Sequence, residues 1–256
     1  MTDAPKYVVA GRGRWATRMQ AILSAGHRRI ASVEETRQGP MEDAAVYRQR
    51  LSVAFKASGA QIAWLCVPPG SHIPSMIQAA VEAGLHVIVE KPWFCSPEET
   101  HRLQDLGKHH GRVLAIHYEY CLLEQAEHWR TQWQGEAGLL FGGRMLVNRP
   151  NHVGIPPLDN LGSHLFSIHE YCVPNAAIVA MDCAYEQPDE RRVWLEQGHR
   201  RIAEIDLLAN KEPIIQRFFV RVEAAIRGDE FPFDLNFALK VAERTALWRR
   251  HANQQQ

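Results

Sequence analysis

The sequence has no excess of charge of either sign. It carries 29 Lys and Arg residues and 29 Asp and Glu residues, so its formal net charge is zero. A chain with this balance is not drawn to nucleic acid or to an anionic membrane by its overall charge. We therefore expect a partner that a local site recognises, namely a small-molecule substrate, and neither nucleic acid nor membrane.

The sequence also lacks paired cysteines and long apolar runs. Its five cysteines contain no C-x-x-C pair, and this odd number favours reduced thiols over a disulfide framework. No apolar run approaches the length of a membrane span, and the chain passes from a few polar residues directly into a predicted strand without a charged-then-apolar leader. We expect a cytoplasmic protein.

The first half of the chain contains alternating strand and helix patterns. This order is typical of a parallel sheet with helices on both faces, whose strands are buried and whose carboxyl ends form a ligand crevice. The predicted strands are residues 6–10, 29–33, 61–67, 85–89 and 112–118, and the predicted helices are residues 15–24, 41–58, 71–83 and 96–110.

After residue 120 the alternation stops. Strands are predicted at residues 139–149, 176–185, 192–196 and 200–207, and helices at 121–134, 158–172, 213–227 and 234–250. A short turn joins the last two strands, which predicts antiparallel pairing. We therefore predict an α/β protein with two domains, 1–120 and 121–256. The second is a smaller α+β domain with an antiparallel sheet, and the terminal helices are free to pack back on the first domain.

The first glycine turn indicates what the first domain binds. The segment VVAGRGRWA places Gly11, Gly13 and Ala16 in a G-x-G-x-x-[GA] pattern, directly after a strand and at the start of a helix. Such a turn lets the backbone and the helix N-terminus approach a pyrophosphate. Glu34 follows the next strand, where an acid is expected to hold the ribose hydroxyls. We predict a Rossmann dinucleotide-binding domain, and a structural turn is the alternative interpretation.

Two side chains bear on the choice between NAD and NADP. A carboxylate at Glu34 would repel the 2′-phosphate of NADP, whereas Arg37 would attract it. The cofactor is therefore predicted to be NAD or NADP, with NAD slightly preferred.

The end of the fourth predicted strand has an unusual composition. In EAGLHVIVEKPW the strand ends in Glu90, Lys91 and Pro92, residue types that a buried strand normally avoids. Because the carboxyl ends of parallel strands line the crevice, the charged pair can face a ligand there. An exposed loop salt bridge is the alternative interpretation.

The segment AQIAWLCVPPGSHIPSMIQAAVEAGLHVIVEKP resembles the central signature of the glucose-fructose oxidoreductase, inositol dehydrogenase and rhizopine catabolism protein family (Gfo/Idh/MocA). With GRGRWA and the later GLLFGG, NRP and LGSH segments, the resemblance covers about residues 6–170. It implies a nicotinamide-binding Rossmann domain and a second domain whose open-faced sheet holds the substrate. The implied cofactor-binding residues are Gly11, Gly13, Arg14, Trp15, Ala16, Glu34, Val67, Pro68, Pro69, His72, Glu90 and Lys91.

The resemblance also implies catalytic residues. The family's Glu-Lys-Pro lysine contacts the nicotinamide ribose and the reacting hydroxyl or carbonyl, a role that falls on Lys91. The family's second element is an acid followed four residues later by a histidine, and LDNLGSHLFSIH places His164 at the histidine and Asn160 at the acid. Asparagine can orient an imidazole, but it cannot stabilise an imidazolium by charge. Asp159 is rotated about 100° away around a helix.

Other histidines are expected to be less informative. Apart from the resemblance, a satisfied structural histidine is the alternative interpretation of His164. Four further histidines are each predicted to be structural or solvated when taken singly, namely His72, His117, His152 and His169.

Two departures from the family pattern affect the predicted substrate side. The second domain has about four predicted strands where the family commonly has six or more, so its sheet looks shortened. The segment IHYEYCLLE replaces the family's usual Asn-Arg stretch after the last Rossmann strand. Cofactor binding is therefore better supported than any particular substrate.

Two functions from different classes follow. The first is an NAD(P)-dependent oxidoreductase that transfers hydride between nicotinamide and a sugar, a cyclitol or a similar carbonyl or imine. The second is a non-catalytic dinucleotide-binding regulator or partner subunit derived from this family. As in the family, we expect a homodimer through the open sheet of the second domain.

Overall fold

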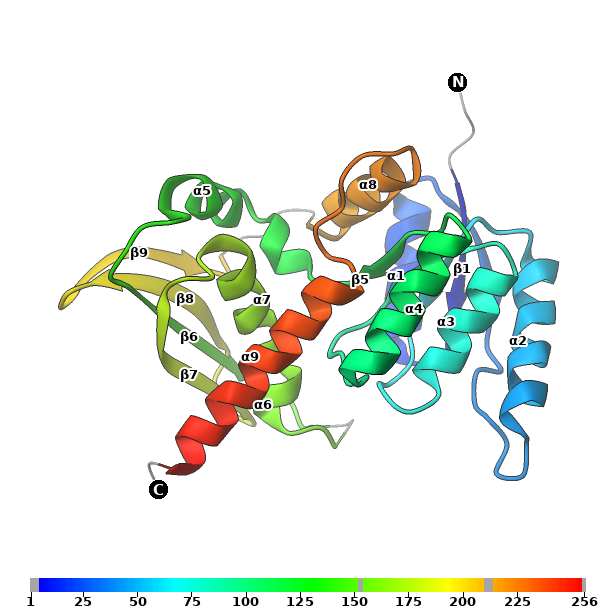
Figure 1. Cartoon of the computed structure of the whole chain (residues 1–256), viewed down its shortest axis with the longest axis horizontal. Coiled ribbons are helices and arrows are strands. Elements are labelled where there is room, and N and C mark those ends of the chain that lie inside the picture. Colours follow the sequence, from blue (N-terminus) through cyan, green and yellow to red (C-terminus); the bar gives the residue numbers. More distant parts are fainter. Residues whose placement is uncertain (1–4, 152–153, 210–213, 255–256) are drawn as a thin grey trace. The chain divides into compact units, whose positions relative to one another are not determined.

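The computed structural model describes residues 5–151, 154–209 and 214–254. The chain divides into two compact units (Figure 1). The first unit comprises residues 1–117 and 216–239, and the second comprises residues 118–215 and 240–256. His152 lies outside the described residues.

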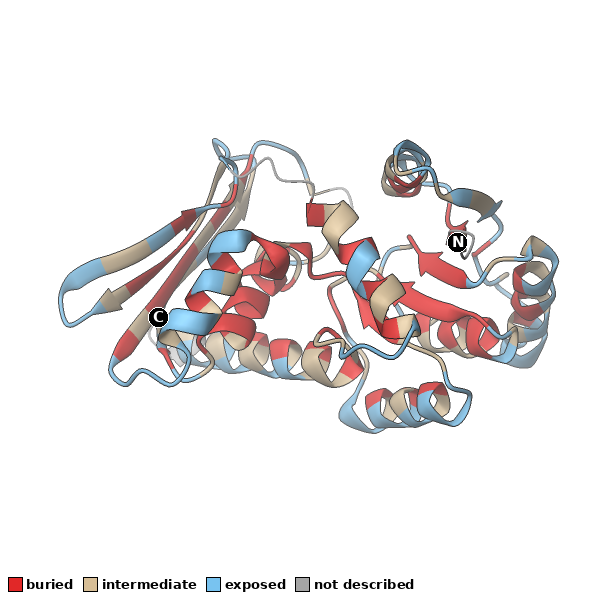
Figure 2. Ribbon diagram, turned by 90° about the horizontal axis from the view of Figure 1, so that it is seen from above, coloured by how far each residue is buried: buried red, intermediate tan, exposed pale blue. Residues whose placement is uncertain are grey.

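The first unit is built on a five-stranded sheet in which every pair of neighbours is parallel. Apolar residues dominate β1, β3, β4 and β5, which are buried almost throughout, whereas β2 is largely exposed or half-buried (Figure 2). The prediction of a parallel sheet is confirmed. The strand order is β2-β1-β3-β4-β5, made from β1 (Lys6–Ala10), β2 (Arg29–Val33), β3 (Ile62–Leu65), β4 (His86–Val89) and β5 (Leu114–Ile116).

Helices connect these strands, and side-chain caps start two of them. The Asp43 carboxylate accepts a hydrogen bond from Ala45 N before α2, and the Ser96 hydroxyl accepts one from Glu99 N before α4. None of the described helices is both long and apolar enough to cross a membrane. The connecting helices are α1 (Arg14–Ala25), α2 (Ala44–Ser58), α3 (Ile73–Glu82) and α4 (Pro97–His109).

Most of α8 (Ile214–Ile226) belongs to the first unit, although it comes late in the chain. Glu223 on this helix accepts a hydrogen bond from the Tyr7 hydroxyl at 2.8 Å and pairs with Arg28 Nε at 2.6 Å. Gln216 donates to the Ile22 carbonyl. These contacts hold α8 against β1 and α1.

The second unit contains a four-stranded sheet in the order β7-β6-β8-β9. Helix α7 packs on β6 and β7, and α5 packs on α7. The long last helix α9 (Leu235–Gln254) joins this unit from Lys240 onward. The other elements are η1 (Glu119–Leu122), α5 (Glu124–Trp133), β6 (Leu139–Val147), α6 (Pro157–Asn160), α7 (Gly162–Cys172), β7 (Ala177–Tyr185), β8 (Glu190–Gln197) and β9 (Arg200–Asp206).

This second sheet is mixed, not wholly antiparallel as the sequence suggested. The β8–β9 hairpin and the β6–β8 pair are antiparallel, whereas β6 and β7 run parallel. The reason is the connection: helices α6 and α7 lie between β6 and β7 in the chain, and such a crossover returns the next strand in the same direction. Consecutive strands β7 and β8 are not neighbours, because β6 lies between them.

Two adjacent glycines in β6 identify the faces of this sheet. A Cβ on Gly143 would meet the Leu165 side chain of α7, so this residue faces the helices. A Cβ on Gly142 would lie 2.2 Å from the Trp194 ring on β8, so Gly142 and Trp194 share the opposite face. The Trp194 ring is buried there, and the Arg201 guanidinium lies 4.5 Å from the ring centroid.

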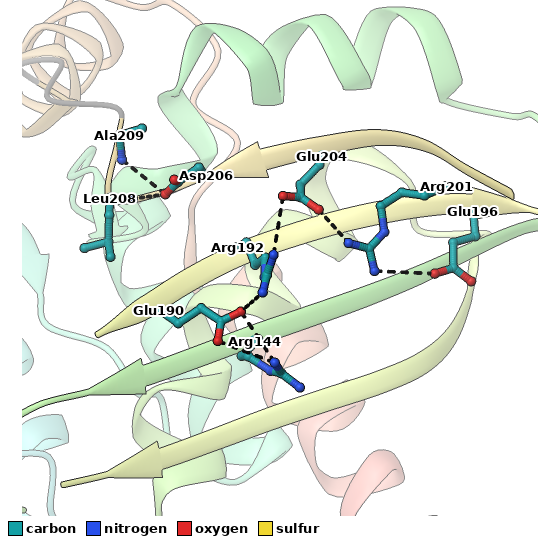
Figure 3. Close-up of polar contacts among 9 residues, drawn as sticks. All are labelled: Arg144, Glu190, Arg192, Glu196, Arg201, Glu204, Asp206, Leu208 and Ala209. Carbon is teal, nitrogen blue, oxygen red and sulfur yellow. Dashed lines mark hydrogen bonds and ion pairs between the residues drawn. The ribbon is translucent and has the colours of Figure 1, made fainter. Parts of the chain in front are cut away.

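An ion-pair ladder crosses the face that holds Trp194 (Figure 3). Arg144 lies 3.0 Å from Asp182 and 3.4 Å from Glu190, Arg192 pairs with Glu190 and Glu204, and Arg201 lies 2.6 Å from Glu204 and 3.8 Å from Glu196. Exposed pairs of this kind each contribute about 0–1 kcal/mol and are screened by salt. A homodimer through this face would have to desolvate the ladder.

We predict that Gly142→Ala destabilises the second unit by about 1–3 kcal/mol, because the added methyl group overlaps the Trp194 ring. In a Trp194→Val background the same substitution should cost much less, since the obstructing ring is gone. Chemical denaturation of the four chains of this double-mutant cycle measures the coupling. Gly143→Ala, on the other face, is the control and should show little coupling to Trp194. Additive free energies for Gly142→Ala and Trp194→Val would contradict this packing.

Candidate functional site

The glycine turn after β1 has the geometry of a ligand cradle. Gly11 has φ of +130°, and a Cβ there would lie 2.5 Å from the Cys66 carbonyl oxygen, so only glycine fits. Its N–H donates to the Val33 carbonyl at 2.9 Å. Gly13, in contrast, is exposed and has ordinary extended backbone, and nothing lies within 4 Å of the place where its Cβ would be. The fold therefore requires glycine at position 11, whereas the missing side chain at Gly13 leaves open space beside the turn.

The N-terminus of α1 beside Gly13 suits an anion. Among the described residues no side chain caps this helix, and its first turn contains no acidic residue. The N–H groups of the first turn and the positive end of the helix dipole are therefore available to a pyrophosphate. Arg14 is exposed in this turn, Trp15 is half-buried, and Ala16 is buried.

Glu34 lies next to this cradle. It directly follows Val33, the residue whose carbonyl accepts the Gly11 N–H, and it is exposed. The loop beyond it is held by Arg50, which donates to the carbonyls of Glu35 and Arg37 and pairs with Glu42. Glu34 and Arg37 are thus on one ordered loop at the carboxyl end of β2.

The carboxyl end of β4 and the loop that leads from β3 into α3 border a cavity of about 490 Å³ within the first unit. Pro69, Glu90 and Pro92 are among its lining residues, together with Ser71 and Cys95. Of the other residues predicted here, Val67 and His72 are half-buried and Pro68 is exposed. Burial lowers the pKa of His72, which favours its neutral form near pH 7.

Two side chains of the first unit hold the Glu90 carboxylate. Trp64 Nε1 donates to its carboxylate at 2.9 Å, and His117 Nδ1 lies 3.2 Å from the same oxygen. Burial alone would raise the pKa of Glu90, but the neighbouring His117 brings it below its ordinary value. Glu90 is therefore a buried anion paired with His117. Its carboxylate anchors the segment in which half-buried Lys91 comes next.

The predicted helix around His164 is interrupted. It forms two pieces, α6 and α7. At the break, Ser163 Oγ donates to the Asn160 carbonyl and His164 N donates to the Leu161 carbonyl. Both hydrogen bonds reach three residues back, so they replace the usual i→i−4 bonding. The Asn160 amide donates to the Tyr185 hydroxyl of β7. Asp159 pairs with Arg249 of α9. Both polar side chains of α6 are therefore tied to other elements of the second unit.

His164 lies among groups that the sequence did not single out. Its Nδ1 is 4.0 Å from the Glu119 carboxylate on η1, and both side chains are about nine-tenths buried. The Tyr120 ring meets the imidazole edge-on at 4.9 Å, and Arg191 of β8 donates to the Tyr120 hydroxyl at 3.4 Å. Burial, and then the charge of Glu119, raises the pKa of Tyr120.

Two other histidines, His117 and His169, are buried. His169 is fully buried, its Nε2 lies 2.9 Å from the Ala176 carbonyl oxygen, and burial lowers its pKa to about 4. His117 is buried against the Trp64 and Phe218 rings beside Glu90.

The structure brings some predicted site residues together within each unit. The Gly11–Val33 hydrogen bond joins the glycine turn to the residue before Glu34. Glu90 and Lys91 follow β4, which lies in the same sheet and is separated from β1 by β3. Asn160 and His164 lie in the second unit. Sequence reasoning missed Glu119, and the available signal was the IHYEYCLLE segment, which departs from the family pattern and contains this residue.

We predict that Gly13→Val weakens NADH binding at least tenfold, about 1.4 kcal/mol, because the new side chain fills the open space in the cradle. Thermal unfolding should show at most about a 1 kcal/mol loss of stability, since only the helix N-cap preference is affected. Gly11→Ala is the contrasting variant and should destabilise the fold itself. Fluorescence titration measures binding. Unchanged NADH affinity in Gly13→Val would show that the turn is structural.

Comparison with known families agrees with the geometry of the first unit. Residues 5–118 match the model of the Gfo/Idh/MocA oxidoreductase family, described as having an NAD-binding Rossmann fold. Biliverdin reductase A of Mus musculus is 28% identical over 132 residues, which cover 52% of this chain and 41% of that protein. The chain aligns with less than half of the length of the curated relatives that it matches.

Solved structures extend the likeness to the whole fold. UDP-N-acetylglucosamine 3-dehydrogenase GnnA from Acidithiobacillus ferrooxidans superposes with a TM-score of 0.76 at 16% identity, covering 96% of this chain and 97% of that chain. The WlbA (WbpB) dehydrogenase from Thermus thermophilus, in complex with NAD and UDP-GlcNAcA, gives 0.72 at 14% identity, covering 96% and 94%. Residues 5–118 thus match the NAD-binding Rossmann domain of the Gfo/Idh/MocA oxidoreductase family, and the chain as a whole shares its fold with these dehydrogenases.

Proposed function

We propose that this protein is an NAD(P)-dependent oxidoreductase acting on a sugar, a cyclitol or a carbonyl or imine of comparable size. The observation that carries the proposal is that parallel strands β1, β2 and β4 end at one edge of a sheet, where they present the Gly11–Gly13 turn, Glu34 and Lys91. This is the crevice in which open α/β sheets bind dinucleotides. The open space at Gly13 and the uncapped N-terminus of α1 fit a pyrophosphate.

The proposed roles follow from the chemistry of each group. When bound, the nicotinamide would supply or accept the hydride at its C4 atom. Lys91 would hydrogen-bond the reacting oxygen or nitrogen, and His164 would exchange the proton of that group. Asn160 would help to orient His164. Arg14, Trp15, Ala16, Val67, Pro68, Pro69 and His72 would line the cofactor beside the glycine turn and the end of β3.

The kinds of relatives support a hydroxyl or carbonyl substrate. The structures of similar fold include dehydrogenases named for a UDP-sugar or crystallised with one, and a curated relative is named a reductase. A carbohydrate or cyclitol is therefore the first substrate class to screen. We further propose a cytoplasmic enzyme that forms a homodimer through the sheet of the second unit.

We predict that NADH binds more tightly than NADPH, because the Glu34 carboxylate repels a 2′-phosphate. Glu34→Gln should reduce this preference about tenfold, about 1.4 kcal/mol. Calorimetric titration with both cofactors measures the two dissociation constants. Glu35→Gln, an exposed neighbour with the same change of charge, should alter the preference less. A tenfold or greater preference for NADPH in the unmodified protein would show that Glu34 is wrongly assigned.

We predict that Lys91→Ala lowers kcat at least a hundredfold and leaves NADH affinity within a few-fold, because the ammonium group acts on the reacting atoms. Steady-state kinetics and fluorescence titration on the same preparation separate the two effects. Lys56→Ala, which removes an exposed lysine from α2, is the control and should leave both quantities unchanged. Near-normal turnover in Lys91→Ala would favour the alternative interpretation, in which Lys91 forms an exposed salt bridge in the loop.

Tight NADH binding without turnover on any substrate class would favour the regulator instead. Cofactor binding by itself does not separate these two functions, so the turnover screen has to accompany every titration.

A further inference from the structure

We infer that Glu119 is the charge partner of His164 and acts as a positioning residue that keeps this imidazole protonated. Only the effect of this pair on catalysis rests on the proposed function. The pairing itself is a property of the second unit and can be measured without turnover.

The geometry of the pair is that of a partly buried ion pair. Glu119 Oε2 and His164 Nδ1 lie 4.0 Å apart, within the range where an opposite charge acts strongly on a titrating group. The side chains of Glu119 and His164 are 11% and 10% exposed, so little water screens the interaction. Glu119 also comes from a separate element, the 3₁₀ helix that directly precedes α5, and not from the helix that holds His164.

The arrangement supplies what the sequence of α6 lacks. Asn160 stands where the family pattern has an acid, and an amide provides no negative charge for an imidazolium. The neighbouring Asp159 is already paired with Arg249. The Glu119 carboxylate therefore provides, from η1, the negative charge that position 160 cannot provide.

The other charged and titratable groups around this pair also affect the protonation of His164. Tyr120 packs edge-on against the imidazole, and its raised pKa keeps it neutral near pH 7. The cations Arg191 and Arg149 act on Tyr120, and Arg191 hydrogen-bonds its hydroxyl. These arginines disfavour an imidazolium nearby, so the Glu119 anion is the group in this set that favours it.

The sign of the pH effect follows from this charge arrangement. An ionised Glu119 lowers the free energy of protonated His164 and leaves that of the neutral form almost unchanged, so the pair keeps the proton on His164 to a higher pH. Removing the charge should release the proton at lower pH. For a histidine that donates its proton during reduction, the basic limb of the rate profile would move to lower pH by the same amount.

The test is an NMR titration of the full-length protein with labelled histidine side chains, assigned with His164→Gln. Glu119→Gln should weaken the proton affinity of His164 about tenfold, which is a fall of about one unit in its pKa. Glu136→Gln, the same charge change at an exposed site of the second unit, is the control and should leave it unchanged. An unchanged pKa of His164 in Glu119→Gln would overturn the inference.

A second variant covers the case in which Glu119→Gln does not fold. Glu119→Asp keeps the charge and shortens the side chain, so it should keep most of the proton affinity of His164, and circular dichroism checks its fold. A Glu119→Asp protein that is folded but has lost this affinity would also overturn the inference.

Turnover measurements then separate this inference from the proposed function. If the pKa of His164 falls in Glu119→Gln and the basic limb of the rate profile moves with it, both are supported. If the pKa falls while His164→Gln still turns over normally, the pairing stands, and the proton-exchange role proposed for His164 fails.

Discussion

The backbone of Gly11 is held between two strands, and the rest of the proposed cofactor site depends on that constraint. Its N–H is bonded to the carbonyl at the end of β2, and its α-carbon lies so close to the Cys66 carbonyl after β3 that no side chain fits. After this constrained residue α1 starts at Arg14, and no side chain of the described residues caps it. The same bond places Glu34 one residue beyond the contact point. A single close packing of three strand ends thus places both the glycine turn and Glu34 of the proposed dinucleotide site.

A second feature is the use of buried carboxylate–histidine pairs on either side of Tyr118. His117 pairs with Glu90 in the first unit, and Glu119 pairs with His164 in the second. Glu90 directly precedes Lys91, and Glu119 lies beside His164. Lys91 and His164 are both proposed to act in catalysis. Burying an ion pair carries a desolvation cost, so such pairs are better explained by positioning and charge than by stability. The short segment from His117 to Tyr120 accordingly contributes to both units.

The sequence predicted well the parts of the structure that local rules control. Continuous apolar strands and the glycine turn after the first strand are short-range signals, and the parallel sheet follows from them. The direction of β7 depends on a crossover through α6 and α7, which no local pattern in β7 records. The break between Asn160 and Gly162 depends on hydrogen bonds from Ser163 and His164 to carbonyls three residues back. Glu119 could not be assigned because its partner is 45 residues away in the chain and is brought near only by the fold of the second unit.

We propose that this cradle holds a nicotinamide dinucleotide whose hydride is exchanged with a small-molecule substrate. The most direct measurement is the transfer of deuterium from C4-deuterated NADH to members of a carbonyl and imine library, read by mass spectrometry of the products. We expect deuterium incorporation into at least one carbohydrate or cyclitol-like substrate, and we expect Lys91→Ala to abolish it. Tight binding of NADH with no deuterium in any product of the library would contradict it.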